Sequence, residues 1–134
     1  MAQRVSASWQ GVDYLFNAWV KADESGMEMT LLNELGVSMG ELSYRNGLVS
    51  FSSQIFPKSM RPEYIVADFQ FCFYHDPALR HALEKCGLAF KNTGNSRCIL
   101  QGSTVIIEIE KEQNTIRLVN HLRKYSYTME GIFE

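Results

Sequence analysis

The sequence lacks a long apolar run, a strong excess of charge and an extended basic cluster. No stretch approaches the ~20 apolar residues that a membrane-spanning helix needs, and the first residues, Met1 to Arg4, lack the apolar stretch of a signal peptide. The 13 basic and 15 acidic side chains leave a formal net charge of −2. Nucleic-acid binding depends on many phosphate contacts, and Arg123-Lys124 beside His121 is too small a cluster for them. We therefore expect a soluble chain without a nucleic-acid partner.

Motifs for catalysis and for cofactor binding are missing as well. The sequence contains no nucleophile elbow, P-loop, dinucleotide glycine fingerprint or paired-cysteine zinc site. Its three cysteines, Cys72, Cys86 and Cys98, are odd in number and have no CxxC spacing. At least one must be unpaired, so they are either buried free thiols or a Cys72–Cys86 disulfide with one thiol left over. We expect no cofactor.

The three histidines offer the main route to a metal or an acid–base site. His75, His81 and His121 could converge with Asp76 or Glu84, or one of the last two histidines could activate Cys86. His75 and His81 are six residues apart and lie on either side of an expected helix boundary, so they do not share a helix face. A solvated helix surface explains them better, and we predict neither a metal site nor a catalytic residue.

The sequence does have enough apolar residues for one core. Hydrophobic residues make up 46% of the 134 residues and charged residues 21%. This length matches the commonest domain size, so we expect a single domain over residues 1–134. Strand patterns, two helical segments and further strand patterns follow one another along the chain, which indicates a strand-rich α+β fold.

Four strands are expected in the first part of the chain, as an antiparallel meander between Ser8 and Ser53. Asn46-Gly47 is the strongest hairpin signal in the sequence, because a type I′ turn needs positive φ at both central residues. The first strand carries Leu15 and Trp19 opposite its main apolar face, so we expect it to be covered on both sides or to line a cavity. The four strands are 14–20, Met27–Leu32, Glu41–Tyr44 and Leu48–Ser53.

Two helices are expected next. Apolar residues recur at helical spacing from Arg61 to Tyr74, with Pro62 at the first helical position, although the aromatic and β-branched residues also allow a strand. The second helix, Pro77 to Cys86, has Asp76 as its expected N-cap and Gly87 as its C-terminal glycine. Its apolar face is Leu79, Ala82, Leu83 and Cys86. The strands that follow are Leu88–Phe90, Arg97–Gln101, 104–110, Thr115–Asn120 and Tyr125–Phe133.

Large adaptable side chains are abundant, with eight Phe, six Tyr, two Trp and six Met. A helix over Arg61–Tyr74 is apolar most of the way round, so it is either a core helix or a lid over an apolar cavity. Arg97 is interpreted as a rim residue that forms a salt bridge or contacts an anionic head group, or as a surface arginine. The expected cavity-lining residues, chosen by face and size, are Phe16, Trp19, Met29, Leu31, Phe51, Ile65, Phe69, Phe73, Ile107 and Ile109.

An ordered set of short motifs resembles a known group of proteins. The glycine-led aromatic strand from Gly11 to Val20 and the segment Gly40-Glu41-Leu42-Ser43-Tyr44 look like the first half of the lipoprotein-localisation proteins LolA and LolB. From Trp9 to Ile132 the chain resembles an uncharacterised family of LolB-like bacterial lipoproteins encoded beside fatty-acid-type and aryl-polyene biosynthesis genes. The further residues that carry this resemblance are Pro62-Glu63-Tyr64, Ala67-Asp68-Phe69-Gln70, Asp76-Pro77-Ala78-Leu79, Leu83, Gly87, Arg97, Leu118-Val119-Asn120 and Tyr125.

The resemblance implies a half-open antiparallel β-barrel with two helices inserted mid-chain as a lid over an apolar cavity for acyl chains. It also implies a periplasmic protein at the inner face of the outer membrane, anchored by a lipidated N-terminal cysteine. This sequence has no lipobox and no cysteine before Cys72. The expected partners are a lipid or the acyl chain of a lipidated cargo, and a membrane by peripheral contact or through an N-terminal lipid anchor.

The leading hypothesis is therefore a non-enzymatic binder or carrier of acyl chains in the bacterial cell envelope. One alternative is a protein–protein interaction module of an envelope or biosynthetic assembly, acting through an exposed patch or strand edge. A filled barrel with an apolar outer patch would favour it. A second alternative is an acyl-thioester enzyme with His75 or His121 as base, which requires a histidine beside a carboxylate or Cys86 at the mouth of a deep pocket.

Overall fold

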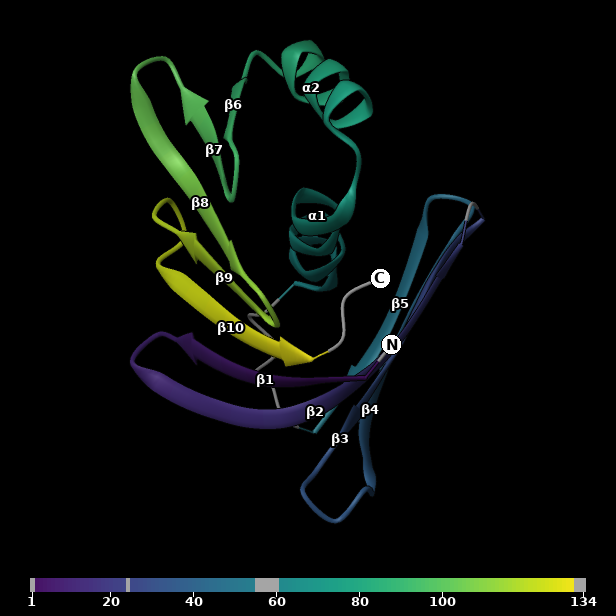
Figure 1. Cartoon of the computed structure of the whole chain (residues 1–134). Helices are drawn as coiled ribbons and strands as arrows, with labels where there is room; N and C mark the ends of the chain where they lie inside the picture. Colours follow the sequence, from purple (N-terminus) through teal and green to yellow (C-terminus); the bar gives the residue numbers. More distant parts are fainter. Residues whose placement is uncertain (1, 24, 55–60, 132–134) are drawn as a thin grey trace.

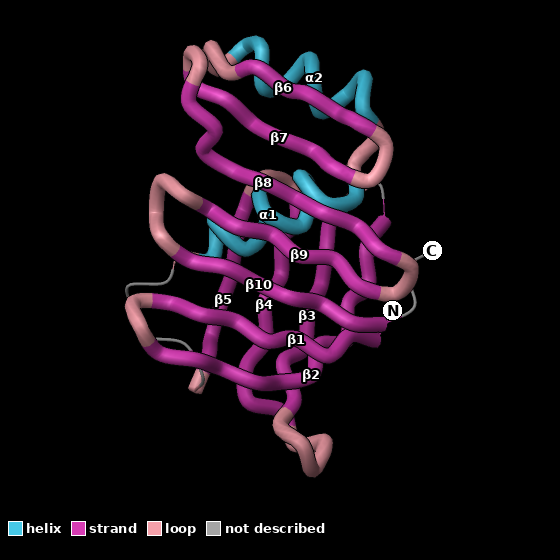
Figure 2. The backbone as a smooth tube through the Cα atoms, turned by 60° about the vertical axis from the view of Figure 1, so that its left-hand side comes forward, coloured by secondary structure: helices cyan, strands magenta, loops and turns pink. Residues whose placement is uncertain are grey.

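Ten strands form one continuous antiparallel sheet in the computed structural model, which describes residues 2–23, 25–54 and 61–131. The sheet order is β5-β4-β3-β2-β1-β10-β9-β8-β7-β6, so β5 and β6 are its two edges and the sheet stays open. It curves around a concave side, as an open barrel does (Figures 1 and 2). The strands are β1 (Ala2–Trp9), β2 (Val12–Asp23), β3 (Gly26–Leu32), β4 (Ser38–Arg45), β5 (Leu48–Ser53), β6 (Ala89–Thr93), β7 (Ser96–Gln101), β8 (Thr104–Glu112), β9 (Thr115–Asn120) and β10 (Tyr125–Gly131).

The expected mostly antiparallel α+β architecture is confirmed, and each predicted strand is found within a few residues of its expected bounds. The last predicted strand extended to Phe133, and its end lies outside the described residues. The β4–β5 hairpin has Asn46 at φ 55° and Gly47 at φ 76°, as the predicted type I′ turn requires. Period-two alternation gives the concave face its apolar lining, because every second side chain of these strands points toward it.

Strand β1 is missing from the expected meander, which therefore has five strands rather than four. It pairs with β2 on one side and with β10 on the other, so it joins the two halves of the sheet. Its sequence alternates as a half-buried strand does: Val5, Ala7 and Trp9 are buried, while Arg4 and Ser6 are exposed. Small and polar residues between these positions keep its apolar content low, which hides the pattern from a search for apolar segments.

Of the two alternatives for β2, cover on both faces is wrong, whereas a cavity on one face is present, since Phe16 and Ala18 line a pocket. Leu15 and Trp19 lie on the convex side, where they are 49% and 54% exposed, while Phe16, Ala18 and Val20 point to the core. Apolar residues on both faces thus do not mean that both faces are covered. No second layer of the described chain packs on this side of the sheet (Figure 1).

Both helices form where they were predicted, α1 at Pro62–Phe73 and α2 at Asp76–Lys85, and the alternative of a strand over the first segment is wrong. They connect β5 to β6, the two opposite edges of the sheet, so the helix pair must cross the concave side. Figure 1 shows α1 inside the curve of the sheet and α2 beside β6. No helix of the described chain is long and apolar enough to cross a membrane.

The ends of the helices follow the expected signals in part. Pro62 is in the first turn of α1, and Gly87 after α2 has φ 77°, with its N–H donating to the carbonyl oxygen of Glu84. Asp76 is not the N-cap of α2: His75 occupies that position without a side-chain cap, and Asp76 is the first helical residue. On the predicted apolar face of α2, Leu79 and Leu83 are buried, whereas Ala82 and Cys86 are exposed.

Candidate functional site

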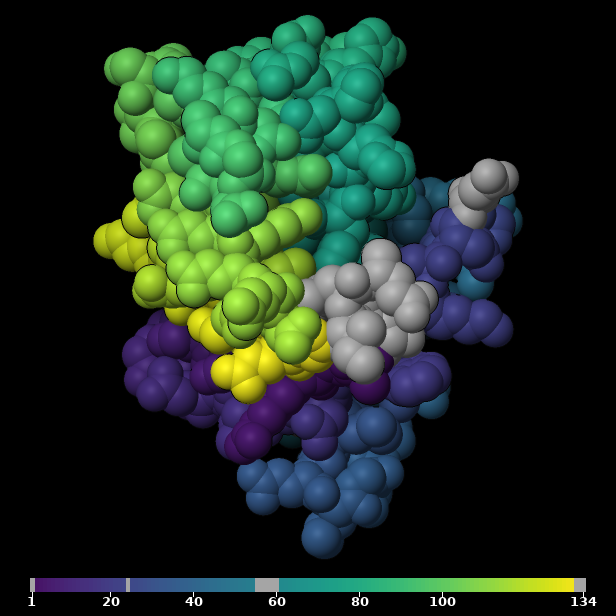
Figure 3. All heavy atoms as spheres, in the orientation of Figure 1, coloured from purple at the N-terminus to yellow at the C-terminus, as the bar shows by residue number. Residues whose placement is uncertain are grey.

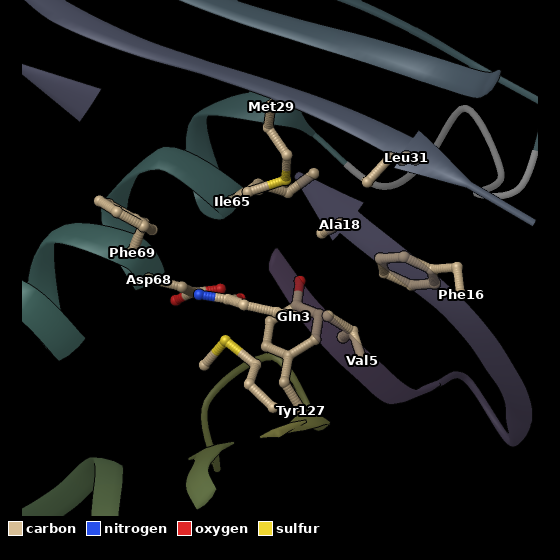
Figure 4. A pocket seen from close by; sticks show the side chains of 11 residues that line it. Gln3, Val5, Phe16, Ala18, Met29, Leu31, Ile65, Asp68, Phe69 and Tyr127 are labelled. Atoms are coloured by element: carbon tan, nitrogen blue, oxygen red, sulfur yellow. The ribbon is translucent and has the colours of Figure 1, made fainter. Parts of the chain in front are cut away.

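A small apolar pocket lies between the concave face of the sheet and α1. Its volume is about 50 Å³, and side chains from β1, β2, β3, β10 and α1 surround it (Figure 4). The strand register brings these side chains together: Val5 is opposite Phe16 on one side and Met129 on the other, and Ala18 is opposite Leu31. The lining residues are Gln3, Val5, Phe16, Ala18, Met29, Leu31, Ile65, Asp68, Phe69, Tyr127 and Met129.

Five of the ten predicted lining residues contribute to this pocket, namely Phe16, Met29, Leu31, Ile65 and Phe69. The apolar pattern of the sequence does not reveal β1 and therefore missed Gln3 and Val5. It also missed the contribution of β10, because only the pairing of β1 with β10 brings Tyr127 and Met129 next to β2. Alternation within each strand could have indicated the inward face, but not which strands are neighbours.

A second and wider space lies beside the first. This open recess of about 860 Å³ is bordered by the end of β2 and by the junction of α1 and α2, including Lys21, Asp23 and His75. Phe69 borders both the pocket and the recess. Its ring lies 4.6 Å from that of Phe73, so these two aromatic side chains form the part of α1 that separates the two spaces.

The other five predicted lining residues lie elsewhere. Phe73 and Trp19 border the open recess, and Trp19 belongs to the convex face of β2. Ile107 and Ile109 are buried in the core on β8, and Phe51 is half-buried on the edge strand β5; none of these three lines the pocket or the recess. The prediction that these three side chains face inward is confirmed, but the core packs closely around them and leaves no space for a pocket.

Asp68 places a carboxyl group in the wall of the apolar pocket. It is 5% exposed, and its Oδ2 accepts a hydrogen bond of 2.6 Å from the Tyr125 hydroxyl. Burial raises the pKa of Asp68 to about 7, against the opposing effects of the Tyr125 hydrogen bond and of the positive charge of Arg123. The guanidinium of Arg123 stacks on Tyr64 of α1, with 4.0 Å between its Cζ and the ring centroid. The signal in the sequence was a single acidic residue in the apolar stripe of the helix.

Arg97 forms a salt bridge, as one alternative for it predicted, and it also binds the backbone of the helix corner. Its Nη1 donates to the carbonyl oxygens of Phe71 and Tyr74 at 2.8 and 2.9 Å, and its Nη2 lies 3.5 Å from Oδ1 of Asp76. The last carbonyl groups of a helix have no partner within the helix, and Arg97 supplies one. Only 13% of its side chain is exposed, and Arg97 fastens the α1–α2 corner to β7.

The cysteines are all free thiols, which excludes the Cys72–Cys86 disulfide. Only Cys72 is fully buried; Cys98 is half-buried and Cys86 is exposed. Burial raises the pKa of Cys72 to about 12, and the negative charge of Asp68 adds to this rise. A thiol with such a pKa is not a nucleophile at neutral pH.

The histidines do not gather at the pocket in the part of the chain that the structure describes. His121 Nε2 lies 3.1 Å from Oε2 of Glu108, and both side chains are about half exposed on the surface. His75 borders the open recess. No group of three or more His, Cys, Asp or Glu side chains that could hold a metal ion occurs among the described residues.

Comparison with known proteins provides a family but no activity. No curated protein matches the chain. The sequence profile of one family, described as protein of unknown function (DUF3261), matches residues 1–132 and thus covers every strand and helix described above. The chain belongs to the DUF3261 family.

Proposed function

We propose that this protein binds a lipid acyl chain, or the acyl chain of a lipidated cargo, between α1 and the concave face of the sheet, and that it does so without catalysing a reaction. The observation that supports this proposal is the apolar pocket at that position. It is lined from both sides, by the sheet and by α1, and shares Phe69 with an open recess. A chain could therefore enter from the recess once the Phe69 side chain moves aside.

The volume of the pocket sets a condition on this function. A space of about 50 Å³ holds little more than one or two small groups, whereas sites for drug-sized ligands occupy roughly 300–1,000 Å³. An acyl chain thus requires α1 side chains to move, and Met29 and Met129 in the wall can adapt their shape. Burial of a twelve-carbon chain at about 0.8 kcal/mol per methylene yields a gross gain near 10 kcal/mol, from which the cost of this opening is subtracted.

The place of action that we propose is the bacterial cell envelope, on the periplasmic side of the outer membrane. The resemblance to LolA and LolB supports it, with the open sheet as a half-open barrel and the helix pair as its lid. Peripheral membrane contact agrees with the connection between β3 and β4, where Leu35 is 88% and Val37 is 55% exposed. This end of the molecule projects from the rest (Figure 3).

Native mass spectrometry of protein purified from a bacterial host, followed by organic extraction, tests the proposal directly. We expect a fatty acid or phospholipid at a stoichiometry near one per chain. Protein that is empty and that also ignores fluorescent fatty-acid probes would contradict acyl-chain binding.

Filling the pocket provides a matched mutational test. Ala18→Val adds two methyl groups to a wall of the space of about 50 Å³, and we expect it to weaken probe binding at least several-fold. Ala89→Val makes the same change at an exposed position on β6 and should leave binding intact. Phe69→Asp should abolish binding in a folded protein; folded variants that bind as the wild type does would refute the site.

A second candidate function is a protein–protein interaction module, and two observations favour it. The enclosed space is small, and two large exposed apolar side chains, Leu15 and Trp19, lie on the convex face of β2. The edges β5 and β6 also leave one side of each strand without a neighbour in the described sheet. Trp19→Ser should then prevent capture of a partner from envelope extracts without changing the binding of fatty-acid probes.

A further inference from the structure

The apolar pocket contains a small set of buried polar groups that acyl-chain packing does not use. Eight of its eleven lining residues have apolar side chains, the two methionines included. The other three, Gln3, Asp68 and Tyr127, have polar groups. These three are 4%, 5% and 9% exposed. In Figure 4, Asp68 and Gln3 lie on the Phe69 side of the pocket, and Phe16 lies at the opposite side.

Asp68 offers one acceptor to the pocket. Its Oδ2 accepts a hydrogen bond of 2.6 Å from the Tyr125 hydroxyl, and Asp68 stands in the wall of the pocket. The charged and titratable groups around it are Tyr125 and Tyr127 from β10, Cys72 from α1 and Arg123 from the connection between β9 and β10. A carboxyl group can accept more than one hydrogen bond, so Asp68 can accept a further one from a ligand in the pocket.

Tyr127 offers a donor. Its hydroxyl group is buried and lacks a hydrogen-bond partner among the residues that the structure describes. The Trp9 indole N–H is also buried and has no partner within the described ranges, but Trp9 does not line the pocket. In Figure 4 the Tyr127 hydroxyl points into the pocket toward Ala18. A buried phenol in this condition is costly, and a ligand that pairs with it would remove the cost.

A hydroxyl group matches this pair of sites, because it donates one hydrogen bond and accepts others. We infer that the pocket selects an apolar chain that carries a neutral hydroxyl group, which donates to Asp68 and accepts from Tyr127 while the chain extends toward Phe16 and Leu31. This inference rests on the proposed binding of an apolar chain and adds the chemistry of its polar end.

Charge explains why a hydroxyl suits the site better than an ionised group. A carboxylate would place a second acidic group beside Asp68, and either a carboxylate or an alkylammonium would lose the hydration of a full charge in an apolar wall, a cost that a neutral hydroxyl does not have. The raised pKa of Asp68 agrees with this, since the site already disfavours a full charge. A long-chain alcohol and an acylglycerol share the required hydroxyl.

The test compares four ligands that share a ten-carbon chain, by isothermal titration calorimetry at pH 7. We expect 1-decanol to bind more tightly than decanoate, decylammonium and decyl methyl ether, and Tyr127→Phe to reduce its affinity about three- to tenfold without affecting the ether. Tyr44→Phe, at a half-buried tyrosine on β4 outside the pocket, is the matched control. Asp68→Asn reports on the acceptor side.

The outcomes separate this inference from the proposed function. Equal affinity for all four ligands, unchanged in Tyr127→Phe, would leave chain binding standing and overturn the hydroxyl preference. Tighter binding of decanoate or decylammonium would also overturn it. Absence of binding by every ligand would remove the proposed function itself. Given the hydroxyl preference, a monodecanoylglycerol that binds more tightly than 1-decanol would identify an acylglycerol as the source of the hydroxyl group. Tighter binding of 1-decanol would identify a free long-chain alcohol.

Discussion

Asp68 couples the stability of the protein to pH. Burial raises the pKa of this carboxyl from 3.8 to about 7. The folded state therefore holds the proton more tightly than the unfolded state, so this contribution to stability is complete below about pH 4 and is lost as pH rises through 7. The loss has an upper limit on the order of 4 kcal/mol, at about 1.4 kcal/mol for each unit of pKa difference.

Asp68→Asn should remove this dependence and keep an acceptor for the Tyr125 hydroxyl. Urea unfolding at pH 5 and at pH 8 measures the effect: we expect the wild type to lose more free energy of unfolding between these values than the variant does. The histidines and other titrating groups are present in both proteins, so they cancel in the difference. Equal losses in the two proteins would show that Asp68 ionises as an ordinary exposed carboxyl group does.

Arg97 stabilises the helix corner through charge-assisted hydrogen bonds to two backbone carbonyl groups. Arg97→Ala leaves these carbonyls and Asp76 without their partner, and we expect a loss of about 1–3 kcal/mol in the free energy of unfolding. Arg117→Ala, at an exposed position on β9, should change it by less than about 0.5 kcal/mol. Denaturant unfolding measures the free energy of unfolding of both variants. A change in Arg97→Ala as small as that in Arg117→Ala would argue against a role of Arg97 in fastening α1.

At the scale of elements, β1 is the strand on which the sheet depends. Ser6 faces outward on β1, opposite Leu15 of β2 and Thr128 of β10. Proline at this position removes a backbone N–H from a strand that is paired on both sides, so Ser6→Pro should cost roughly 3 kcal/mol or more, or prevent folding. Ser6→Ala retains the N–H and should unfold almost as the wild type does. Circular dichroism with urea tells the two apart, and a well-folded proline variant would contradict the central position of β1.

The two helices show which local signals are sufficient. Pro62 favours a helix start because its ring fixes φ, and Gly87 favours a helix end because glycine readily adopts positive φ. Both residues lie at the helix ends where they were expected. Asp76 did not become a cap, because its carboxylate pairs with Asn92 at 2.8 Å and lies near Arg97. Asn92 and Arg97, which are distant in sequence, thus bind the Asp76 carboxylate in place of the backbone N–H groups that it was expected to cap.

At the scale of the whole molecule, the helix pair joins opposite edges of an open sheet, and the proposed entry of a ligand requires α1 side chains to move. A ligand that binds only the folded protein stabilises it, by about 2.7 kcal/mol at a concentration of 100 times its Kd. We expect 1-decanol to raise the melting temperature and to slow hydrogen exchange in α1 more than in β8. A ligand that leaves both unchanged at saturating concentration would place binding outside this pocket.

Local sequence determined the type and the approximate bounds of nearly all the elements, because turn residues and alternation act over a few positions. Asn46-Gly47 specifies its hairpin without help from the rest of the chain, and the helical spacing after Pro62 specifies α1. The same patterns indicate that Phe16 and Leu31 face inward. They do not indicate that Trp19 stays exposed, since exposure depends on whether another layer covers its face.

Tertiary structure alone decided which inward residues share a pocket. Val5 and Met129 become neighbours through the pairing of β1 with β10, which are separated by most of the chain. Asp68 meets Tyr125 only when α1 lies in the curve of the sheet, and that position follows from the opposite edges that the helices connect. Such contacts join residues far apart in sequence, so no local pattern encodes them; they arise from the order in which strands pair and from the closeness with which a core packs.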